Sequence, residues 1–455
     1  MGISRTAFNI NELTIATFHA ALRQQTTSCT AVVCAYLERI AHHDQALQSL
    51  ISINNNAIAA AHEKDEETRT LCDRNQPFPT LHGVPVILKD NIGTFDLPTS
   101  AGNKALATLR TSEDSSVVAD LRRAGAIILA KANLHEFALH GTTTSSLGGQ
   151  TRNPYDLTRT PGGSSGGTAA ALAANLGLVG CGSPVEESSR CADVVYGDDG
   201  GMEPAGRESR PPGEIRIGVL DAYFHLEESR SSLPEALVEE NEIVQRVIRA
   251  AVSSIGEAVH ITLVPVEPTA DWRLATLLVQ ADTQAFEFRE CLDGFLQSSV
   301  VSSTPHRSLE SIAQSGEFDK NAITEVFTAP LEKPEIYSRR SAEYRAQLDF
   351  IASLKESVQR CFDAAGIDFM VYPHQRHLAV PIGMTRQPRR NGVLAALTGR
   401  PAICVPAGRS PPTPSAIQGI PIGLEIMGRY EHDEALLDVA EQIEYILQAR
   451  ATPIE

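Results

Sequence analysis

The sequence has 455 residues, of which 42% are hydrophobic and 21% charged, and this composition is typical of a globular protein rather than a disordered chain. Its 39 basic and 56 acidic residues give a formal net charge of −17. Contacts with nucleic acid or an anionic membrane surface need clustered lysines and arginines, so we expect neither partner. The N-terminal residues lack the apolar run of a secretory signal, and a cytoplasmic location is therefore expected.

Helical patterns dominate the beginning of the chain. Ser28 can cap a helix in which apolar residues recur at helical spacing from Val32 to Ile40. A second helical pattern, rich in alanine and glutamate, covers residues 58–68. We predict an N-terminal helical segment over residues 1–78, packed around one large core formed by residues 79–455.

The core begins with a strand, a helix and a second strand. Residues 83–88 and 126–130 are short apolar runs, and a helix that Asp114 or Ser115 can cap lies between them. This order predicts a βαβ unit and hence a mainly parallel sheet. A polar stretch rich in glycine and proline predicts an irregular linker at about 196–214. Further strand patterns cover residues 215–220, 260–266, 369–372, 402–405 and 420–427. The predicted fold class is α/β.

Glycine, serine and threonine dominate residues 141–168, and the loop at 162–167 could have several functions. It lacks both the lysine of a phosphate-binding P-loop and the spacing of a dinucleotide-binding fingerprint. Ser164 and Ser165 each satisfy G-x-S-x-G, but the apolar strand that precedes a hydrolase elbow is missing. His135 and His140 are five residues apart, whereas a zinc-binding helix needs four. No metal site and no organic cofactor is predicted.

Lys89 stands at the end of the predicted strand 83–88. A lysine in this place usually extends its amine into water. If Lys89 is buried instead, desolvation depresses its pKa and makes the neutral amine a usable base. A neutral lysine can activate a serine without any histidine.

The sequence resembles the amidase signature family at several separated places. The resemblance covers residues 83–91, 126–133, 148–154, 162–167, 397–408 and 419–424. It implies an amidase signature fold, in which helices flank both faces of a mixed, largely parallel sheet. It also implies hydrolysis of a small-molecule carboxamide to a carboxylate and ammonia or an amine, without a cofactor.

The same resemblance implies a catalytic triad of two serines and a lysine. Lys89 would be the base, Ser164 the bridging serine in a cis peptide, and Ser188, which lies 24 positions later, the nucleophile. The implied oxyanion and binding residues are Val185, Glu186, Glu187 and Ser165, together with a weaker supporting role for the loop at 144–149.

The segment around the implied nucleophile departs from the family pattern G-T-D-x-G-G-S-x-R. Ser183-Pro184 replaces Thr-Asp, and Glu186-Glu187 replaces the paired glycines. Two carboxylates beside a developing oxyanion would repel it. Two interpretations follow: Ser188 is a working nucleophile in an altered loop, or a deletion or mis-joined gene has removed the true nucleophile. The second interpretation makes the chain a catalytically impaired amidase-like protein.

An amidotransferase A-type subunit is a third interpretation of the same motifs. Such a subunit passes ammonia to an aminoacyl-tRNA together with partner subunits. The acidic charge and the absence of a basic patch argue against it. The oligomeric state is left open.

Overall fold

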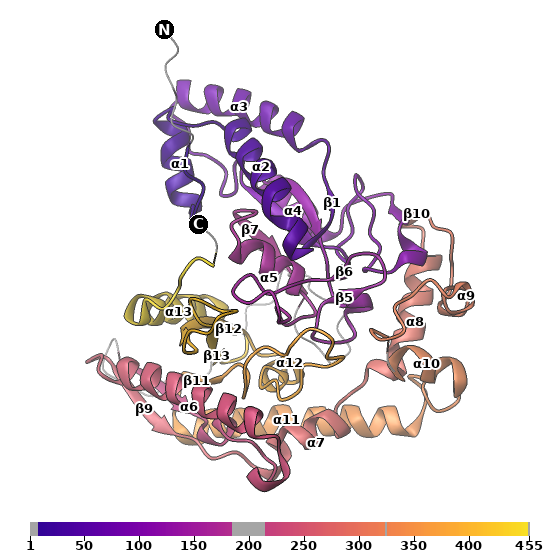
Figure 1. Cartoon of the computed structure of the whole chain (residues 1–455), viewed down its shortest axis with the longest axis vertical. Coiled ribbons are helices and arrows are strands. Elements are labelled where there is room, and N and C mark those ends of the chain that lie inside the picture. Colours follow the sequence, from indigo (N-terminus) through magenta and orange to yellow (C-terminus); the bar gives the residue numbers. More distant parts are fainter. Residues whose placement is uncertain (1–7, 184–213, 324, 454–455) are drawn as a thin grey trace.

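The structure is a computed structural model of the whole chain, and it describes residues 8–183, 214–323 and 325–453. The linker predicted at about 196–214 lies outside these residues, except for its last position. Two mixed sheets, each with its own apolar core, form the centres of the two parts of the described chain (Figure 1).

The first part of the chain folds into a four-stranded sheet surrounded by helices. Its elements are α1 (Ile15–Arg23), α2 (Cys29–Leu47), β1 (Leu50–Ile53), α3 (Ala57–Asp73), β2 (Pro85–Lys89), β3 (Arg110–Thr111), α4 (Ser116–Arg123), β4 (Ile127–Ala132), β5 (Thr144–Ser145), β6 (Gly149–Gln150), α5 (Gly166–Ala173) and β7 (Val179–Cys181). The strand order is β1–β4–β2–β7, in which β2 is parallel to both of its neighbours. Every residue of β2 and β4 is buried, which explains why their sequences are apolar except for Lys89 and Lys131.

The N-terminal segment contributes to this sheet as well as covering it. Ser28 caps α2 by accepting a hydrogen bond from the Ala31 N–H at 3.1 Å, as predicted. The prediction of helices alone over residues 1–78 misses β1, which pairs antiparallel with β4. Four residues between two helices are too few to show a distinct strand pattern. Side chains of α1–α3 join the same apolar core as β2 and β4.

The second part of the chain builds a five-stranded sheet. Its elements are β8 (Ile215–Val219), α6 (Glu235–Gly256), β9 (Ile261–Pro265), α7 (Leu274–Gln280), α8 (Gln284–Gln297), β10 (Val301–Ser303), α9 (Leu309–Ser315), α10 (Glu325–Glu332), α11 (Ala342–Ala365), β11 (Phe369–Pro373), α12 (Val393–Thr398), β12 (Ala402–Arg409), β13 (Pro421–Gly428) and α13 (Asp433–Leu447). The strand order is β12–β13–β11–β8–β9, with β8 parallel to β9 and β11 and the remaining pairs antiparallel. All five strands predicted for this part are therefore present.

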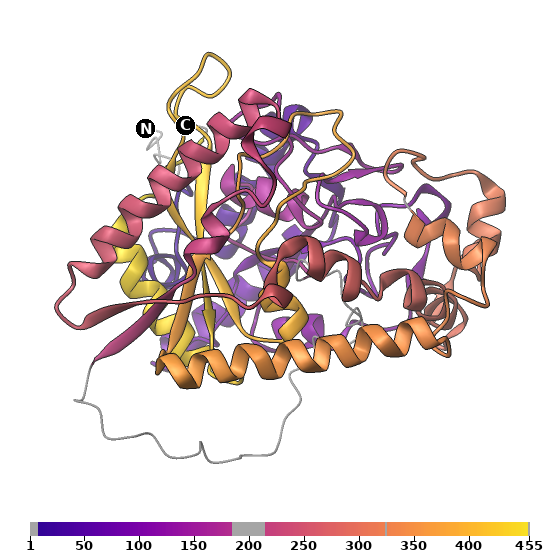
Figure 2. The same cartoon turned by 90° about the horizontal axis from the view of Figure 1, so that it is seen from below.

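Helices cover both faces of the second sheet (Figure 2). Phe369 and Val371 of β11 pack in the cluster that contains α6 and α13, whereas Met370 and Tyr372 pack in the cluster that contains α7, α11 and α12. This alternation follows from the period of two in a strand. The predicted fold class, an α/β fold with a mixed sheet flanked by helices on both faces, is confirmed, although the described strands form two main sheets rather than one.

The only tryptophan of the chain marks the core between the second sheet and α11. Trp272 is 1% exposed, and its indole N–H donates to Ser357 Oγ of α11 at 3.0 Å. The Tyr223 hydroxyl donates to the Trp272 carbonyl at 2.6 Å. The indole is therefore fixed by both packing and hydrogen bonding.

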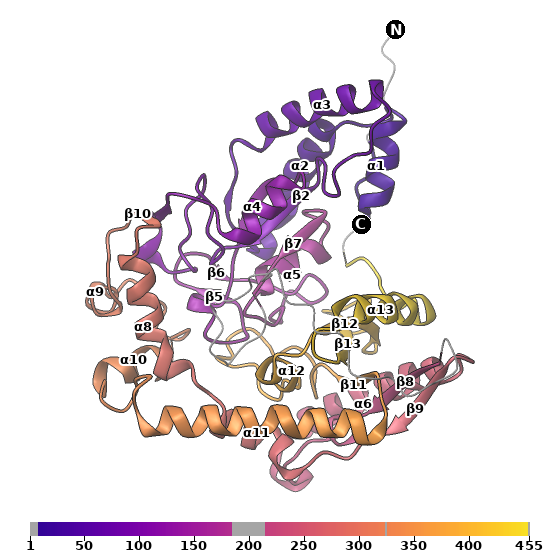
Figure 3. The ribbon, with the colours of Figure 1, turned by 180° about the vertical axis from the view of Figure 1, so that it is seen from behind.

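Helices α8–α10 form a side layer that links the two parts (Figure 3). Strand β10 pairs with β3, so the chain returns from its second part to its first. The rings of Phe137, Phe288 and Phe327 make a common contact, with centroids 5.5–6.3 Å apart. Phe137 belongs to the segment that leads to the glycine-rich loop. The side layer therefore packs against this segment.

Candidate functional site

The side chains of Lys89 and Ser164 meet at the end of β2. Lys89 is the last residue of this strand and is 0% exposed, while Ser164 is 4% exposed. A hydrogen bond of 2.7 Å joins Lys89 Nζ and Ser164 Oγ. The structure thus brings together two residues that are 75 positions apart in the sequence.

A turn held by its neighbours presents Ser164. The peptide bond between Gly163 and Ser164 is cis. The Thr143 hydroxyl donates to the Gly162 carbonyl at 2.6 Å and accepts from the Gly166 N–H at 3.1 Å, and this bridges the two sides of the turn. The His135 N–H donates to the Ser164 carbonyl at 3.0 Å. The backbone of the turn is therefore fixed on both sides of the serine.

The glycine after the turn is required by close packing. A Cβ atom on Gly167 would overlap the backbone carbonyl oxygen of Asn133. The fully buried side chain of Asn133 is itself held by the predicted supporting loop, because Ser145 Oγ donates to Asn133 Oδ1 at 2.7 Å. The loop at 144–149 thus acts on the site by supporting the residue that α5 packs against.

Ser183 is a further hydroxyl at Lys89 that sequence reasoning did not assign. Its Oγ is hydrogen bonded to Lys89 Nζ. The Ser165 hydroxyl donates to the Ser183 carbonyl at 3.0 Å, which ties the predicted binding residue Ser165 to the same segment. Ser183 follows β7, the parallel neighbour of β2, and the shared end of two parallel strands is the signal that could have found it.

Four predicted site residues cannot be placed in this arrangement. Val185, Glu186, Glu187 and Ser188 lie outside the described residues. Their roles as oxyanion donors and nucleophile stay predictions.

A second buried lysine lies on the strand adjacent to that of the first. Lys131 of β4 is 0% exposed, and its Nζ lies 3.5 Å from the carboxylate of Asp90, the residue after Lys89. Burial lowers the pKa of Lys131, and the charge of Asp90 opposes this shift. The Asp90 carboxylate also accepts hydrogen bonds from the N–H groups of Ser100 and Gly102, at 3.0 and 3.3 Å. The pair fixes the chain directly after the Lys89 position.

The segment that approaches Ser164 carries buried ionisable groups. Burial lowers the pKa of His135 to about 4, and the charges of Arg390 and Lys89 act in the same direction. The imidazole bonds Ala322 O through Nε2 at 2.9 Å, so Nδ1 is left to accept from the Thr142 N–H at 3.4 Å. His135 is therefore neutral near pH 7 and has a structural role rather than that of a metal ligand.

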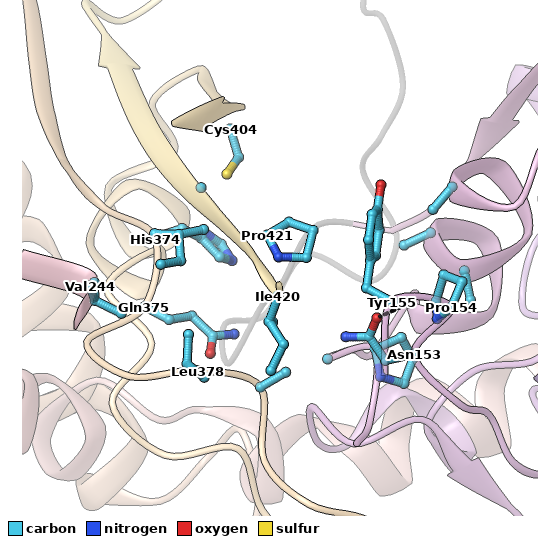
Figure 4. A pocket seen from close by; sticks show the side chains of 18 of the residues that line it. Asn153, Pro154, Tyr155, Val244, His374, Gln375, Leu378, Cys404, Ile420 and Pro421 are labelled. Carbon is cyan, nitrogen blue, oxygen red and sulfur yellow. Dashed lines mark hydrogen bonds between the residues drawn. The ribbon is translucent and has the colours of Figure 1, made fainter. Parts of the chain in front are cut away.

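An uncharged cavity of about 230 Å³ lies between the two sheets (Figure 4). It is bordered by Gly162 and by residues of α5 on one side and by β12, β13 and the segment after β11 on the other. His374 points into this space, with Nδ1 2.7 Å from the buried carboxylate of Glu425. Glu425 also accepts from the Tyr372 hydroxyl at 3.1 Å, so the two partners use both of its oxygens.

Two other kinds of site are absent from the described residues. In residues 8–183, 214–323 and 325–453, no group of three or more His, Cys, Asp or Glu side chains could hold a metal ion. Within the same ranges, no helix combines the length and the apolar character that crossing a membrane requires.

The fold and this centre define an α/β protein in which a buried lysine at a strand end contacts a serine in a glycine-rich turn. Comparisons with known proteins agree with this description of the fold. The family model described as Amidase matches residues 31–191. The A-type subunit of glutamyl-tRNA(Gln) amidotransferase from Thermoanaerobacter pseudethanolicus is 26% identical, with 97% of this chain and 98% of that protein aligned. The protein of the same name in Thermobifida fusca is 35% identical over 254 residues, which are 53% of this chain and 50% of that protein.

Solved structures extend the likeness over nearly the whole chain. The native peptide amidase from Stenotrophomonas maltophilia superposes with a TM-score of 0.75 at 25% identity, covering 97% of this chain and 98% of that one. A bacterial aryl acylamidase described as an amidase signature enzyme gives a TM-score of 0.71 at 16% identity, covering 95% and 96%, and this likeness concerns the fold alone. The resemblance to the amidase signature family that the sequence predicted is therefore confirmed by the family model and by the solved structures.

Proposed function

We propose that this protein hydrolyses the amide bond of a small carboxamide through a covalent acyl-serine intermediate. The observation that supports this function is the fully buried Lys89 amine, 2.7 Å from the Ser164 hydroxyl. Burial removes the hydration that an ammonium group needs, and this favours a neutral amine that can accept a proton from a hydroxyl.

In the proposed reaction, Lys89 and Ser164 carry one proton in both directions. Lys89 Nζ takes the proton of Ser164 Oγ while Ser164 Oγ takes that of the nucleophilic serine, whose oxygen forms a bond to the amide carbon. The tetrahedral intermediate collapses when the C–N bond breaks, and the leaving nitrogen receives the proton through the same two groups. Water then attacks the acyl-serine, which releases the carboxylate and restores the free hydroxyl.

Two serines compete for the role of the nucleophile. We propose Ser188 on the family spacing, with the backbone around Val185, Glu186 and Glu187 as the oxyanion donors. Ser183 is supported instead by its direct contact with Lys89, which would deprotonate it without a relay. In that second arrangement, Ser164 would hold the Lys89 amine in place.

The lengths of the alignments bear on whether internal segments of the chain have been lost. The alignment with the T. pseudethanolicus relative has 501 positions, but this chain contributes only 97% of its 455 residues, about 441. About 60 positions of that alignment therefore have no counterpart in this chain. This supports the interpretation in which internal segments have been lost, and it makes an impaired, amidase-like protein the main alternative to an active hydrolase.

A second candidate function is that of an amidotransferase component. The full-length relatives support it, because they are named as the A-type subunits of glutamyl-tRNA(Gln) amidotransferases. The net charge of −17 argues against direct contact with tRNA, since phosphate contacts need clustered basic residues. Under this function, release of ammonia from glutamine should depend on a partner protein, whereas a hydrolase of small amides needs none.

Labelling with a fluorophosphonate, which reacts covalently with activated serines, tests the proposal. Intact mass is measured after labelling the full chain and the variants Ser164→Ala, Ser183→Ala and Ser188→Ala. We expect one adduct on the natural chain, and we expect only the alanine variant of the nucleophile to abolish it completely. Ser28→Ala, a change in the cap of α2 far along the chain from the site, is the control and should label like the natural chain.

Each result of this experiment assigns a role. An adduct that is lost in Ser188→Ala and retained in Ser183→Ala supports the family spacing, and the reverse result makes Ser183 the nucleophile. An adduct that persists in both variants contradicts both assignments. A natural chain that forms no adduct and releases no ammonia or amine from any carboxamide contradicts the proposed hydrolysis and supports the impaired protein.

A further inference from the structure

A second cavity, of about 290 Å³, differs from the uncharged one in the charge of its walls. Four arginines and two glutamates line it, so the formal charge of its lining is opposite in sign to that of the whole chain. The charged lining residues are Arg376, Arg386, Arg389, Arg390, Glu227 and Glu228. A positive cavity in so acidic a protein attracts small anions selectively.

The two glutamates are already paired with arginines. Arg376 Nη1 lies 3.0 Å from Glu227 Oε1, and Arg389 Nη2 lies 2.7 Å from Glu228 Oε1. Arg386 forms no ion pair within the described part of the chain, although it lies close enough to His140 to lower the pKa of that residue. Four arginines against two glutamates give the lining an excess of positive formal charge.

A buried polar atom in the wall also lacks a partner. His140 Nε2 is buried and has no hydrogen-bond partner among the described residues. Burial lowers the pKa of His140 to about 3, and His135, Arg386 and Arg390 add to this shift. The ring is therefore neutral at pH 7, and only one of its two nitrogens carries a hydrogen. An unpaired buried polar atom of this kind is costly in free energy.

The wall formed by residues 140 and 141 adjoins the Ser164 turn. A Cβ atom on Gly163 would lie 3.1 Å from the carbonyl carbon of Gly141, and one on Gly141 would lie 3.1 Å from Arg390 Nη1. The His140 ring also lies 5.5 Å from the ring of His135, whose N–H donates to the Ser164 carbonyl. Two contacts thus connect the positive cavity with the turn that carries the serine.

We propose that this cavity binds a carboxylate of the substrate, so that the preferred substrates are amides of dicarboxylic acids whose second carboxylate is free. Arg386 would pair with the carboxylate, at the wall that His140 and Arg390 also line. This inference rests on the proposed function and specifies its substrate class. Charge-assisted hydrogen bonds from arginine to carboxylate are strong enough to set such a preference.

A matched pair of amides tests the preference. Succinamate and butyramide have the same carbon chain and differ only in a terminal carboxylate or methyl group. We expect kcat/KM of the natural chain to be at least tenfold higher for succinamate than for butyramide. Arg386→Gln should lower this ratio at least fivefold, whereas Arg74→Gln, an exposed arginine at the end of α3, should leave it unchanged. Arg386 is itself exposed, so its variant is expected to fold.

Binding measurements separate this inference from the proposed hydrolysis. Calorimetric titration with succinamate should show binding to the Ser164→Ala chain and at least fivefold weaker binding when Arg386→Gln is added. This result supports the carboxylate site even if the natural chain hydrolyses no amide. An active chain that prefers butyramide, or succinamate binding that is unaffected by Arg386→Gln, overturns the inference and leaves the hydrolysis itself untouched.

Discussion

Lys131 and Asp90 form a fully buried ion pair at the ends of two adjacent parallel strands, with 3.5 Å between Nζ and Oδ1. Asp90 directly follows Lys89, so the pair anchors the chain where the proposed base is presented. Two lysines are thus buried on adjacent strands, one next to a carboxylate and the other against the hydroxyls of Ser164 and Ser183. This difference in partners predicts that the same substitution damages mainly stability at Lys131 and mainly activity at Lys89.

Replacement of the anchored lysine should damage the fold. Lys131→Met would leave the buried Asp90 carboxylate without its cation, and removal of one partner from a buried pair costs about 3–5 kcal/mol. We expect a loss of this size in the free energy of unfolding, measured by urea denaturation at pH 7. The double variant Lys131→Met/Asp90→Asn removes both charges and should regain part of the loss. A single variant as stable as the natural chain would contradict the importance of the pair.

Replacement of the proposed base should affect activity far more than stability. Lys89→Met keeps the length of the side chain and removes the amine, and loss of general-base catalysis typically lowers the rate by about 10²–10⁴-fold. The partners described for Lys89, Ser164 and Ser183, are neutral hydroxyls. Removal of the amine therefore leaves no unpaired charge on either of them. We expect kcat to fall by this factor while the unfolding midpoint changes much less than in Lys131→Met. An active Lys89→Met enzyme would exclude the proposed base.

A single methyl group should disturb the glycine-rich turn. In Gly167→Ala the new Cβ would overlap the carbonyl oxygen of Asn133, so α5 and the Ser164 turn must move apart. Overpacking in such a place costs about 1–3 kcal/mol or more. Gly294→Ala is the matched control, because nothing lies within 4 Å of its added Cβ in α8, and helix propensity there favours alanine by about 1 kcal/mol. Thermal unfolding should show opposite shifts for the two variants.

Acid should destabilise the protein partly through His140. Its pKa is about 3 in the folded chain, whereas in the unfolded chain it binds a proton near pH 6.5. Its contribution to stability is therefore complete above pH 6.5 and is lost as the pH falls towards 3. His140→Leu removes this titration and breaks no hydrogen bond found among the described residues. Both proteins should lose unfolding free energy between pH 7 and pH 4. The loss should be smaller in the variant than in the natural chain, by on the order of 2–3 kcal/mol. Parallel pH profiles would contradict this role.

The sequence predicted the elements of this fold better than the contacts between them. The apolar runs of β2 and β4 are distinct because both strands are buried throughout, and Lys89 stands out at the end of one of them. Strand β1 could not be predicted, because four residues carry too little pattern.

In the candidate site, too, the contacts between residues could not be predicted from the sequence pattern. Lys89 and Ser164 were paired by family resemblance, and no local spacing could have placed them 2.7 Å apart. The contact of Ser183 with Lys89 and the bridge that Thr143 makes across the turn depend on side chains that tertiary packing brings together. Patterns along one chain indicate elements, but they carry no information about which hydroxyl faces a given amine.

The fluorescence of the single tryptophan reports on only one half of the molecule. Trp272 is enclosed between α11 and the five-stranded sheet, and the four-stranded sheet that carries Lys89 contains no indole. Intrinsic fluorescence will therefore follow the melting of the C-terminal half, whereas far-ultraviolet circular dichroism follows both halves. If the two signals change at different denaturant concentrations, the halves come apart independently, and no reporter group needs to be attached to observe it.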